Sequence, residues 1–216
     1  MPLGRTVHAA GERDKYVYFL TAGIVSRFYT TENGTSTDYA ITGSEGAIGV
    51  GCFLDGEGSS SQAVVLSTGH AYRLLADLLK NEFEHRGRLP FLLMRFLLAL
   101  VAQAGQVAVC TRHHILEQQL CRWILTCLDR LPSNDLIMTQ ELISNMLGVR
   151  REGVTWAAGH LQKLGILHNA RGHIAVLDLP LLNAYACECN EVIRQEYARL
   201  LPAEKSIGNA AVYGHA

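Results

Sequence analysis

The chain has 216 residues, of which 49% are hydrophobic and 18% charged, and its formal net charge at pH 7 is −1. This composition is typical of a globular protein of one or two domains, and it excludes a strongly basic protein that coats nucleic acid without regard to sequence. Any contact with nucleic acid must therefore come from a local patch. No charged and then apolar leader precedes the first predicted strand, so we expect a cytoplasmic protein.

The first third of the chain has the pattern of short strands and turns. Runs of β-branched and aromatic residues are separated by glycine-containing turns, of which Asn33-Gly34 is a strong hairpin signal. The predicted strands are residues 16–20, 24–29, 37–41, 47–54, 62–67 and 71–75. This spacing predicts a small β-roll over residues 1–85.

Residues 76–131 are predicted to be helical. In the run that opens at Leu89-Pro90-Phe91, five apolar residues repeat at alternating spacings of four and three: Leu93, Leu97, Leu100, Ala104 and Val107. This is the spacing of a helix that pairs along a seam, so residues 86–114 are predicted to be a dimerisation helix. A membrane span is the alternative, but Arg95, Gln103 and Gln106 interrupt the run, and we expect no membrane contact.

The cysteine and histidine residues predict no metal site. Six cysteines are scattered along the chain without a paired C-x₂-C pattern: Cys52, Cys110, Cys121, Cys127, Cys187 and Cys189. We expect reduced thiols and no cofactor, and the role of Cys187 and Cys189 stays open. His113 and His114 follow the long helical run, where adjacent side chains point to different faces, which is poor geometry for one metal ion.

The stretch from Met138 to Leu177 predicts a winged helix-turn-helix. Thr139 can cap a short helix, Gly148 can supply the positive φ of a tight turn, and the apolar period restarts after it in a second helix. Residues 166–168 and 173–177 then alternate as two strands around a turn at 169–172. The second helix turns Arg151, Glu152 and Thr155 outward, where Arg can bind a guanine edge and Glu can accept from a cytosine amino group.

These residues resemble the Crp/Fnr-type transcription regulators, which are similar to the cyclic-AMP receptor protein. Counted from Gln140, the apolar and small residues fall where the family's helix-turn-helix pattern has them, and the Arg151-Glu152 pair falls where the family places its base-reading pair. Thr155 matches a position where some members carry a Ser that faces DNA. Trp156 departs from the pattern, which commonly has a second Arg there.

The resemblance and the geometry together predict the DNA contacts. The base-reading residues are predicted to be Arg151, Glu152, Thr155 and Trp156, and the phosphate contacts are predicted to be Arg150, Thr139, Arg171 and His173. The helix start and the wing are positions from which side chains reach the DNA backbone.

By resemblance, residues 1–85 form the family's cyclic-nucleotide-binding-type sensor domain, in a chain shortened at its N-terminus. Nucleotide-binding members place a Glu soon after an Ile-Gly and an Arg-Ser or Arg-Thr about ten residues later; here both charges are missing after Ile48-Gly49 and in residues 58–63. We therefore expect no control by cyclic AMP. Residues Val50, Ser60, Ser61 and Gln62 are candidates for a pocket that holds a different ligand, with a simple loop as the alternative.

The sequence thus predicts an α+β protein in four parts. These are a β-roll sensor (1–85), a dimerisation helix (86–114), a winged helix-turn-helix domain (115–190), and a C-terminal helix with a loose tail (191–216). The predicted function is a dimeric regulator that binds inverted repeats in double-stranded DNA, with RNA polymerase and an unidentified small-molecule effector as further candidate partners. The alternative is a ligand-binding or scaffold protein whose winged helix contacts proteins. We expect no enzyme, because the sequence lacks a phosphate loop, an activated nucleophile and metal-ligand spacing.

Overall fold

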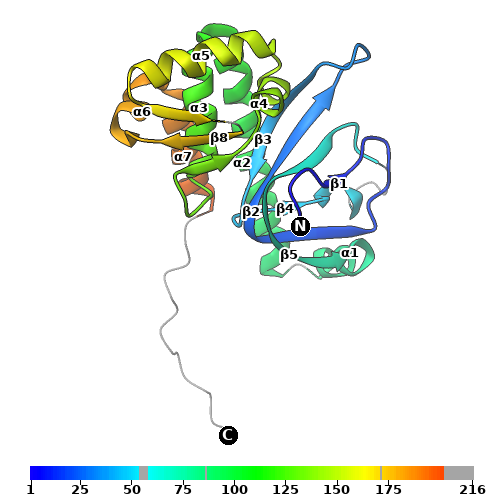
Figure 1. The fold of residues 1–216 in the computed structure, drawn as a ribbon. Helices are drawn as coiled ribbons and strands as arrows, with labels where there is room; N and C mark the ends of the chain where they lie inside the picture. The colour runs from blue at the N-terminus through cyan, green and yellow to red at the C-terminus, as the bar shows by residue number, and fades with distance from the viewer. Residues whose placement is uncertain (54–57, 86, 171, 202–216) are drawn as a thin grey trace, which may run out of the picture.

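The computed structural model describes residues 1–53, 58–85, 87–170 and 172–201. An N-terminal β-roll is joined by one long helix to a C-terminal domain of helices and a small sheet (Figure 1). This is the α+β architecture that the sequence predicts.

The β-roll has five strands in one sheet, in the order β1-β5-β2-β3, with β4 paired to β2. The strands are β1 (Thr6–His8), β2 (Tyr16–Thr30), β3 (Ser36–Thr42), β4 (Ala47–Ile48) and β5 (Gln62–Leu75). The turn at Asn33-Gly34 joins β2 to β3 as predicted, and Gly34 has a φ of 84°. The short strand β1 was not predicted.

Two predicted breaks in the sheet are bulges rather than turns. The runs 16–20 and 24–29 form the single strand β2, and the runs 62–67 and 71–75 form the single strand β5. The pairing register of β2 with β5 shifts around Ala22 and Ile24. Gly23 has a φ of 80°, and a Cβ there would lie 2.6 Å from the Ser67 carbonyl oxygen. The glycine therefore permits a close approach of two continuous strands instead of ending one of them.

The predicted strand 47–54 is wrong in its extent. Only the two residues of β4 pair with β2, and Val50–Phe53 form a 3₁₀ turn. Gly49, with a φ of 85°, ends the strand. Residue 54 lies outside the described part of the chain.

Three helices follow the roll: α1 (Ala76–Glu84), α2 (Arg88–His113) and α3 (Leu116–Leu128). The helical stretch predicted to reach residue 131 therefore ends three residues early, at Leu128. His113 is the last residue of α2, whereas His114 lies beyond it in an extended conformation with φ −109° and ψ 151°. The two histidines thus do not continue on one helix, and the chain turns sharply between α2 and α3.

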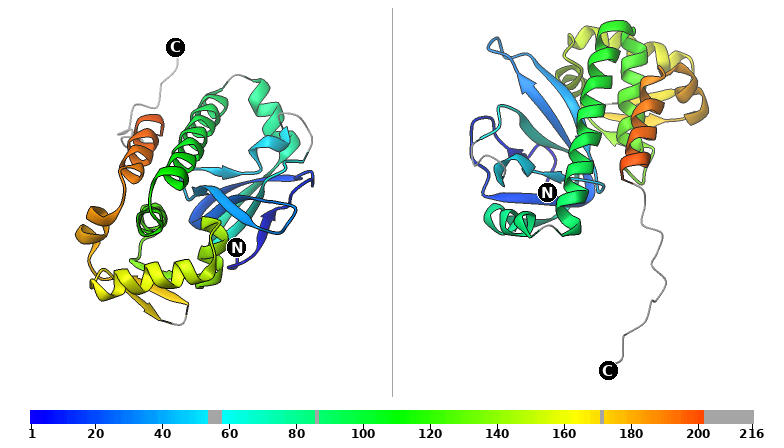
Figure 2. Two further views of the ribbon diagram at one scale, coloured as in Figure 1. Left: turned by 90° about the horizontal axis from the view of Figure 1, so that it is seen from above. Right: turned by 180° about the vertical axis from the view of Figure 1, so that it is seen from behind.

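The predicted pairing seam of α2 faces the interior of its own chain. Leu93, Leu100 and Val107 are buried, and α2 packs against β3 and α7 (Cys189–Leu200). The view from behind shows α2 running between the roll and the C-terminal domain (Figure 2). A different row of residues lies on the exposed or partly exposed side, at the same alternating spacing: Met94, Leu98, Val101, Gly105 and Ala108. The spacing of apolar residues in the sequence does not show which of these two rows packs against the rest of the chain.

Helix α2 is also long and apolar enough to cross a membrane by length and composition, with 33% of its most apolar window buried. A core helix of a soluble protein can meet the same criterion. Within the chain, α2 packs against β3 and α7.

The C-terminal domain confirms the predicted winged helix-turn-helix. It contains α4 (Gln140–Leu147), α5 (Arg151–Lys163), β7 (Leu167–Ala170) and β8 (His173–Val176). Strand β6 (Asp135–Ile137), which was not predicted, pairs with β8 and completes a three-stranded sheet in the order β6-β8-β7. Helix α6 (Leu179–Tyr185) was also not predicted, and α7 follows it. The predicted loose tail at 203–216 lies outside the described residues.

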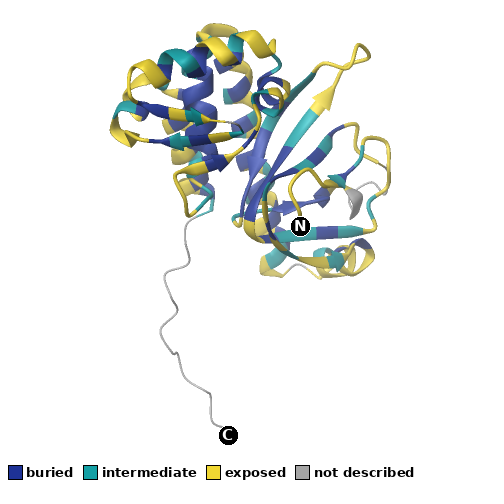
Figure 3. Cartoon of the chain, viewed as in Figure 1, coloured by how far each residue is buried: buried dark blue, intermediate teal, exposed yellow. Residues whose placement is uncertain are grey.

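The two domains share one hydrophobic core. Ile24, Ile41 and Leu66 of the roll belong to the same buried cluster as Trp123 of α3 and Leu147 of α4. Buried residues continue from the sheet into the helices (Figure 3). The position of the helix-turn-helix is therefore fixed by packing against the sensor domain.

Candidate nucleic-acid interface

Helix α4 begins and ends as its sequence predicts. The Thr139 side chain accepts a hydrogen bond from the Leu142 amide at 3.1 Å, which satisfies a free N–H at the helix start. Gly148 ends the helix with φ 67° and ψ 31°, a left-handed conformation that costs glycine little. Arg150 then adopts an extended backbone, and α5 starts at Arg151.

Helix α5 presents the predicted base-reading residues to solvent. Val154, Ala157, Ala158 and Leu161 are buried, whereas Arg151, Glu152, Thr155 and Trp156 are exposed. Arg151 and Glu152 occupy the first turn, which is the part of a recognition helix that enters the major groove. The buried small residues let α5 pack closely on α3 and α4.

Two of these residues already have partners within the domain. The Thr155 hydroxyl donates to Gln140 Oε1 at 2.7 Å and also lies 3.0 Å from the Arg151 carbonyl oxygen. The hydroxyl oxygen of Thr155 still has lone pairs that can accept a hydrogen bond from a DNA base. The Trp156 ring is 62% exposed and stacks on His160, with the ring centroids 5.8 Å apart.

Two of the predicted phosphate contacts, Thr139 and Arg150, lie at the starts of α4 and α5. The Thr155–Gln140 hydrogen bond joins α5 to the start of α4, and a Cβ on Gly172 at the wing turn would lie 3.8 Å from Thr139 Cγ2. Arg150, Thr139 and His173 are exposed. Arg171 lies outside the described residues. The structure thus brings Thr139, the wing and α5 together, as a groove-binding surface requires.

The turn of the helix-turn-helix rests on the β2–β3 hairpin of the sensor domain. The Ser36 hydroxyl donates to the Asn145 carbonyl at 3.2 Å, and the buried Ser26 hydroxyl lies 3.1 Å from Met146 Sδ. A Cβ on Gly148 would collide with Thr37 Oγ1. This direct contact between sensor and reading domain was not predicted, because it joins residues more than 100 positions apart in sequence.

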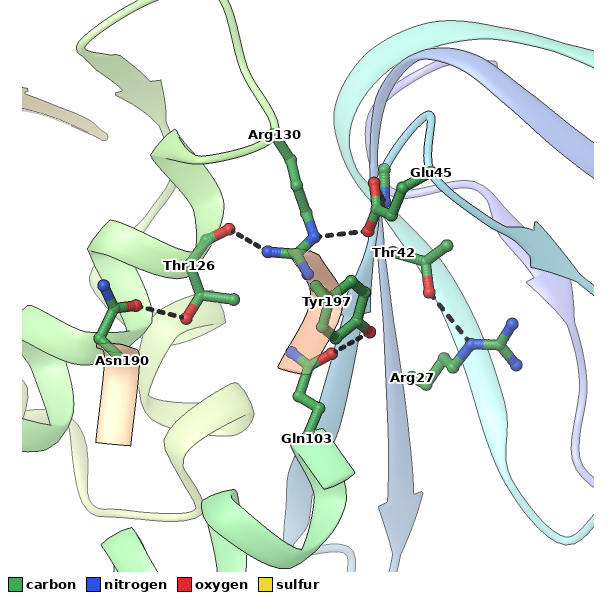
Figure 4. Close-up of polar contacts among 9 residues, drawn as sticks. Arg27, Thr42, Glu45, Gln103, Thr126, Arg130, Asn190 and Tyr197 are labelled. Carbon is green, nitrogen blue, oxygen red and sulfur yellow. Dashed lines mark hydrogen bonds and ion pairs between the residues drawn. The ribbon is translucent and has the colours of Figure 1, made fainter. Parts of the chain in front are cut away.

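A buried polar network joins the two domains a second time. Arg130, after α3, donates to Glu45 Oε1 at 2.7 Å and to the Thr126 carbonyl at 2.9 Å (Figure 4). Its guanidinium lies 4.8 Å above the Tyr197 ring, and the Tyr197 hydroxyl hydrogen bonds to the Gln103 amide at 2.7 Å. Burial raises the pKa of Tyr197 to about 12, so this hydroxyl stays protonated near neutral pH.

A third interdomain contact lies beside Trp123. The Trp123 indole donates to Asp38 Oδ2 of β3 at 2.7 Å, and both residues are buried. Burial raises the pKa of Asp38 to about 6, although nearby Arg122 and the Trp123 hydrogen bond act in the opposite direction. The sequence did not predict these interdomain contacts, because each joins residues far apart in the chain.

Three of the four residues of the predicted ligand pocket are engaged elsewhere. Val50 is buried in a cluster with Val17 and Leu79. The Ser61 hydroxyl is 2.8 Å from that of Ser59, and Gln62 donates to Thr30 at 3.2 Å. Ser60 is exposed. These contacts fit a closed loop and packing better than a set of pocket-lining donors.

Two family models match the chain. Residues 1–86 match the cyclic nucleotide-binding domain, and residues 118–185 match the Crp-like helix-turn-helix domain. No curated protein sequence gave a match.

Solved structures of similar fold are transcription regulators. A CRP-family regulator from Thermus thermophilus superposes with a TM-score of 0.72 at 18% identity, covering 86% of this chain and 95% of that one. FixK2 from Bradyrhizobium japonicum gives a TM-score of 0.73 at 16% identity, covering 86% and 94%. The c-di-GMP-responsive regulator CLP from Xanthomonas campestris gives 0.67 at 14% identity, covering 82% and 92%.

These structural likenesses establish the fold. The two domain matches, in this order along one chain, identify it as a Crp/Fnr-like transcription regulator.

Proposed function

We propose that this regulator binds inverted-repeat operators as a homodimer and that each subunit reads bases mainly through Arg151 and Glu152. The observation that carries the proposal is the exposure of both side chains on the first turn of α5. We further propose that it acts in the cytoplasm, with RNA polymerase and an unidentified small molecule as partners. We also propose the division of the chain into a sensor (1–85), a dimerisation helix (86–114), a DNA-binding domain (115–190) and a C-terminal segment (191–216).

The base assignments follow from donor and acceptor chemistry. Arg151 takes the O6 and N7 atoms of a guanine, and Glu152 accepts from the amino group of a neighbouring cytosine. Trp156 cannot make the bidentate contact of an arginine, so it favours a thymine methyl or leaves its position weakly specified. Arg150, Thr139, Arg171 and His173 contact phosphate.

Selection of bound sequences from random duplex DNA tests this proposal. We expect an enriched inverted repeat whose half-site centres lie about 34 Å apart, one helical turn, because a two-fold dimer places its two recognition helices in successive major grooves. Failure to enrich any sequence, with folded protein, would support the alternative in which the winged helix contacts proteins.

The dimer is proposed to form through the open face of α2. Met94, Leu98 and Val101 are exposed by 52%, 51% and 67%, and the row continues through Gly105 and Ala108 at coiled-coil spacing. We expect Val101→Glu to give a folded monomer in analytical ultracentrifugation, because it places two like charges at the seam. Glu in place of Tyr72, an exposed residue of β5 away from this row, is the matched control and leaves the dimer intact. A monomeric wild type at micromolar concentration, with or without DNA, contradicts the proposal.

Cyclic AMP is proposed not to control DNA affinity. Residues 48–51 and 58–63 carry neither the Glu nor the Arg that would hold a ribose and a cyclic phosphate in an apolar roll. Arg27 of the roll is partly buried but already donates to Thr42 Oγ1 and to the Ala47 carbonyl. Titration calorimetry with cyclic AMP is therefore expected to show no saturable heat; tight saturable binding would overturn this part.

A further inference from the structure

Three cysteines and one histidine meet where the long helix α2 ends. Cys110, His114, Cys187 and Cys189 each offer one ligand atom, and these four atoms all lie within 4.8 Å of one another. Cys110 and Cys189 are fully buried, Cys187 is 6% exposed, and the His114 side chain is 15% exposed. Such a group of soft sulfur and imidazole ligands is the donor set of a tetrahedral zinc site.

The backbone explains why these residues converge. Cys110 and His114 are four residues apart, so they lie one above the other at the last turn of α2 and its C-cap. Cys187 and Cys189 flank the bend between α6 and α7, and α7 packs along α2. Two short pairs from distant segments therefore face each other, which is why the sequence did not reveal them.

Two of the separations between these atoms match those around one tetrahedral ion, and all of them are within 4.8 Å. With zinc–sulfur bonds of about 2.3 Å and zinc–nitrogen bonds of about 2.0 Å, two tetrahedral sulfur ligands lie about 3.8 Å apart, and a sulfur and a nitrogen about 3.5 Å. Cys110 Sγ and Cys187 Sγ are 3.6 Å apart, and Cys189 Sγ is 3.5 Å from His114 Nδ1. The sulfur pair is far beyond the disulfide bond length of about 2.05 Å, so both thiols are reduced here.

The surroundings orient and neutralise such a site. While Nδ1 of His114 faces the sulfur atoms, its Nε2 lies 3.4 Å from Glu188 Oε2, which is the carboxylate–histidine–metal arrangement of zinc proteins. Gln106 donates a hydrogen bond to Cys189 Sγ at 3.1 Å. The buried Arg122 interacts with Cys110, and its positive charge offsets the net negative charge of three thiolates, one imidazole and one divalent ion.

We propose that Cys110, His114, Cys187 and Cys189 bind one Zn²⁺ ion, which clamps the α2–α3 turn to the α6–α7 bend. Binding releases the thiol protons and involves no change of oxidation state. All four ligands come from the protein, as in structural zinc sites, so the ion has no open position for catalysis. The clamp fixes the DNA-binding domain relative to α2, and it stands independently of the proposed operator and dimer.

Metal analysis of the full chain tests the proposal. Protein stripped by a chelator under reducing, oxygen-free conditions is expected to take up one zinc ion per chain, measured by mass spectrometry of the metal and by competition with a chromophoric chelator. Co²⁺ in place of Zn²⁺ is expected to give the thiolate-to-metal charge-transfer band and the intense visible bands of a tetrahedral site.

Matched variants locate the site. His114→Ala is expected to weaken zinc binding by more than about 100-fold, whereas His113→Ala, at the exposed neighbouring position, leaves it unchanged. Glu188→Gln, with a side chain 72% exposed, is expected to weaken it by about 10-fold, the effect of losing an outer partner of a ligand. Cys189→Ala removes the thiolate band of one ligand, and Cys121→Ala, at a buried cysteine outside the cluster, retains the full spectrum.

Several outcomes would overturn the assignment. These are the absence of stoichiometric zinc in folded protein, a Co²⁺ spectrum without thiolate bands, or equal binding by the His114 and His113 variants. A Cys110–Cys187 disulfide, seen by mass spectrometry as the loss of two hydrogens in protein kept under reducing conditions, would also contradict it. The Glu188 and His113 variants change exposed side chains, so a folding defect in a cysteine variant does not remove the test.

Discussion

The two ends of the C-terminal domain differ in how far apart in sequence their residues lie. At the reading end, residues 139–163 supply a cap, a turn and an exposed helix start from one continuous segment. At the junction with α2 and the roll, buried side chains come from distant positions, such as Tyr197 and Gln103, 94 residues apart, and Ser26 and Met146, 120 residues apart. The reading end is exposed to solvent and can contact DNA. The junction packs against the roll and fixes the orientation of the reading end.

This difference separates two kinds of mutational effect. A change at the reading end removes a contact with DNA and leaves the fold intact, because the side chains have few partners within the protein. A change at the junction leaves a buried polar group unpaired and therefore acts on the free energy of unfolding. The following variants test whether the two effects are as separate as the structure implies.

The largest expected effect is at the junction. Arg130→Met should lower the free energy of unfolding by about 3 kcal/mol, because the Glu45 carboxylate, whose side chain is only 23% exposed, loses the positive charge of Arg130 and keeps the Gly43 amide as a donor. Denaturant titration followed by tryptophan fluorescence measures this change. The base preference of the folded fraction, measured by competition between operator and random DNA, should stay as in the wild type.

A double variant controls for lost packing around Arg130. Glu45→Gln combined with Arg130→Met should recover most of the stability, because no buried charge is then left without a partner. If the double variant is as unstable as the sum of both single variants, the Arg130–Glu45 pair is not the cause.

The complementary effect is at the reading end. Arg151→Ala should weaken operator binding by about 1–3 kcal/mol, or roughly 5- to 150-fold, and relax the preference at one base pair. Lys163→Ala, at the other end of α5, is the matched change of charge and should affect operator and random DNA alike. Equal loss on both DNAs for Arg151→Ala would show that Arg151 contacts phosphate instead.

The junction also predicts a pH dependence of stability at Asp38. Its pKa rises from 3.8 to about 6 on folding because the carboxyl is buried, with Arg122, Trp123 and Cys127 facing it. Folded protein therefore binds more protons than unfolded protein in this range, so the contribution of Asp38 to stability is present below pH 3.8 and is lost as pH rises through about 6.

Asp38→Asn should remove this dependence while keeping an acceptor for the Trp123 indole. The measurement is the difference in free energy of unfolding between wild type and variant across that pH range. A difference that does not change with pH would mean that Asp38 ionises as it does in the unfolded chain.

The sequence predicted the local structure of the reading end correctly but did not predict the contacts at the junction. Thr139, Gly148 and the exposed Arg151-Glu152 pair could be located because caps, turns and helix periods are local properties. The face of α2 was misassigned because the helix has two apolar rows, and only the fold shows that Leu100 is covered while Val101 is not. The Cys110–His114 and Cys187–Cys189 pairs were not connected, since only tertiary packing brings them together.

Strand β3 carries contacts to both parts of the DNA-binding domain on one face. Ser36 contacts α4 and Asp38 contacts α3, and residues two apart in a strand point to the same side. A shift of β3 along β2 by one residue would turn both side chains away and break both contacts. A one-residue slide of β3 would therefore release α3 and α4 together, so the register of this one strand fixes how both helices are held.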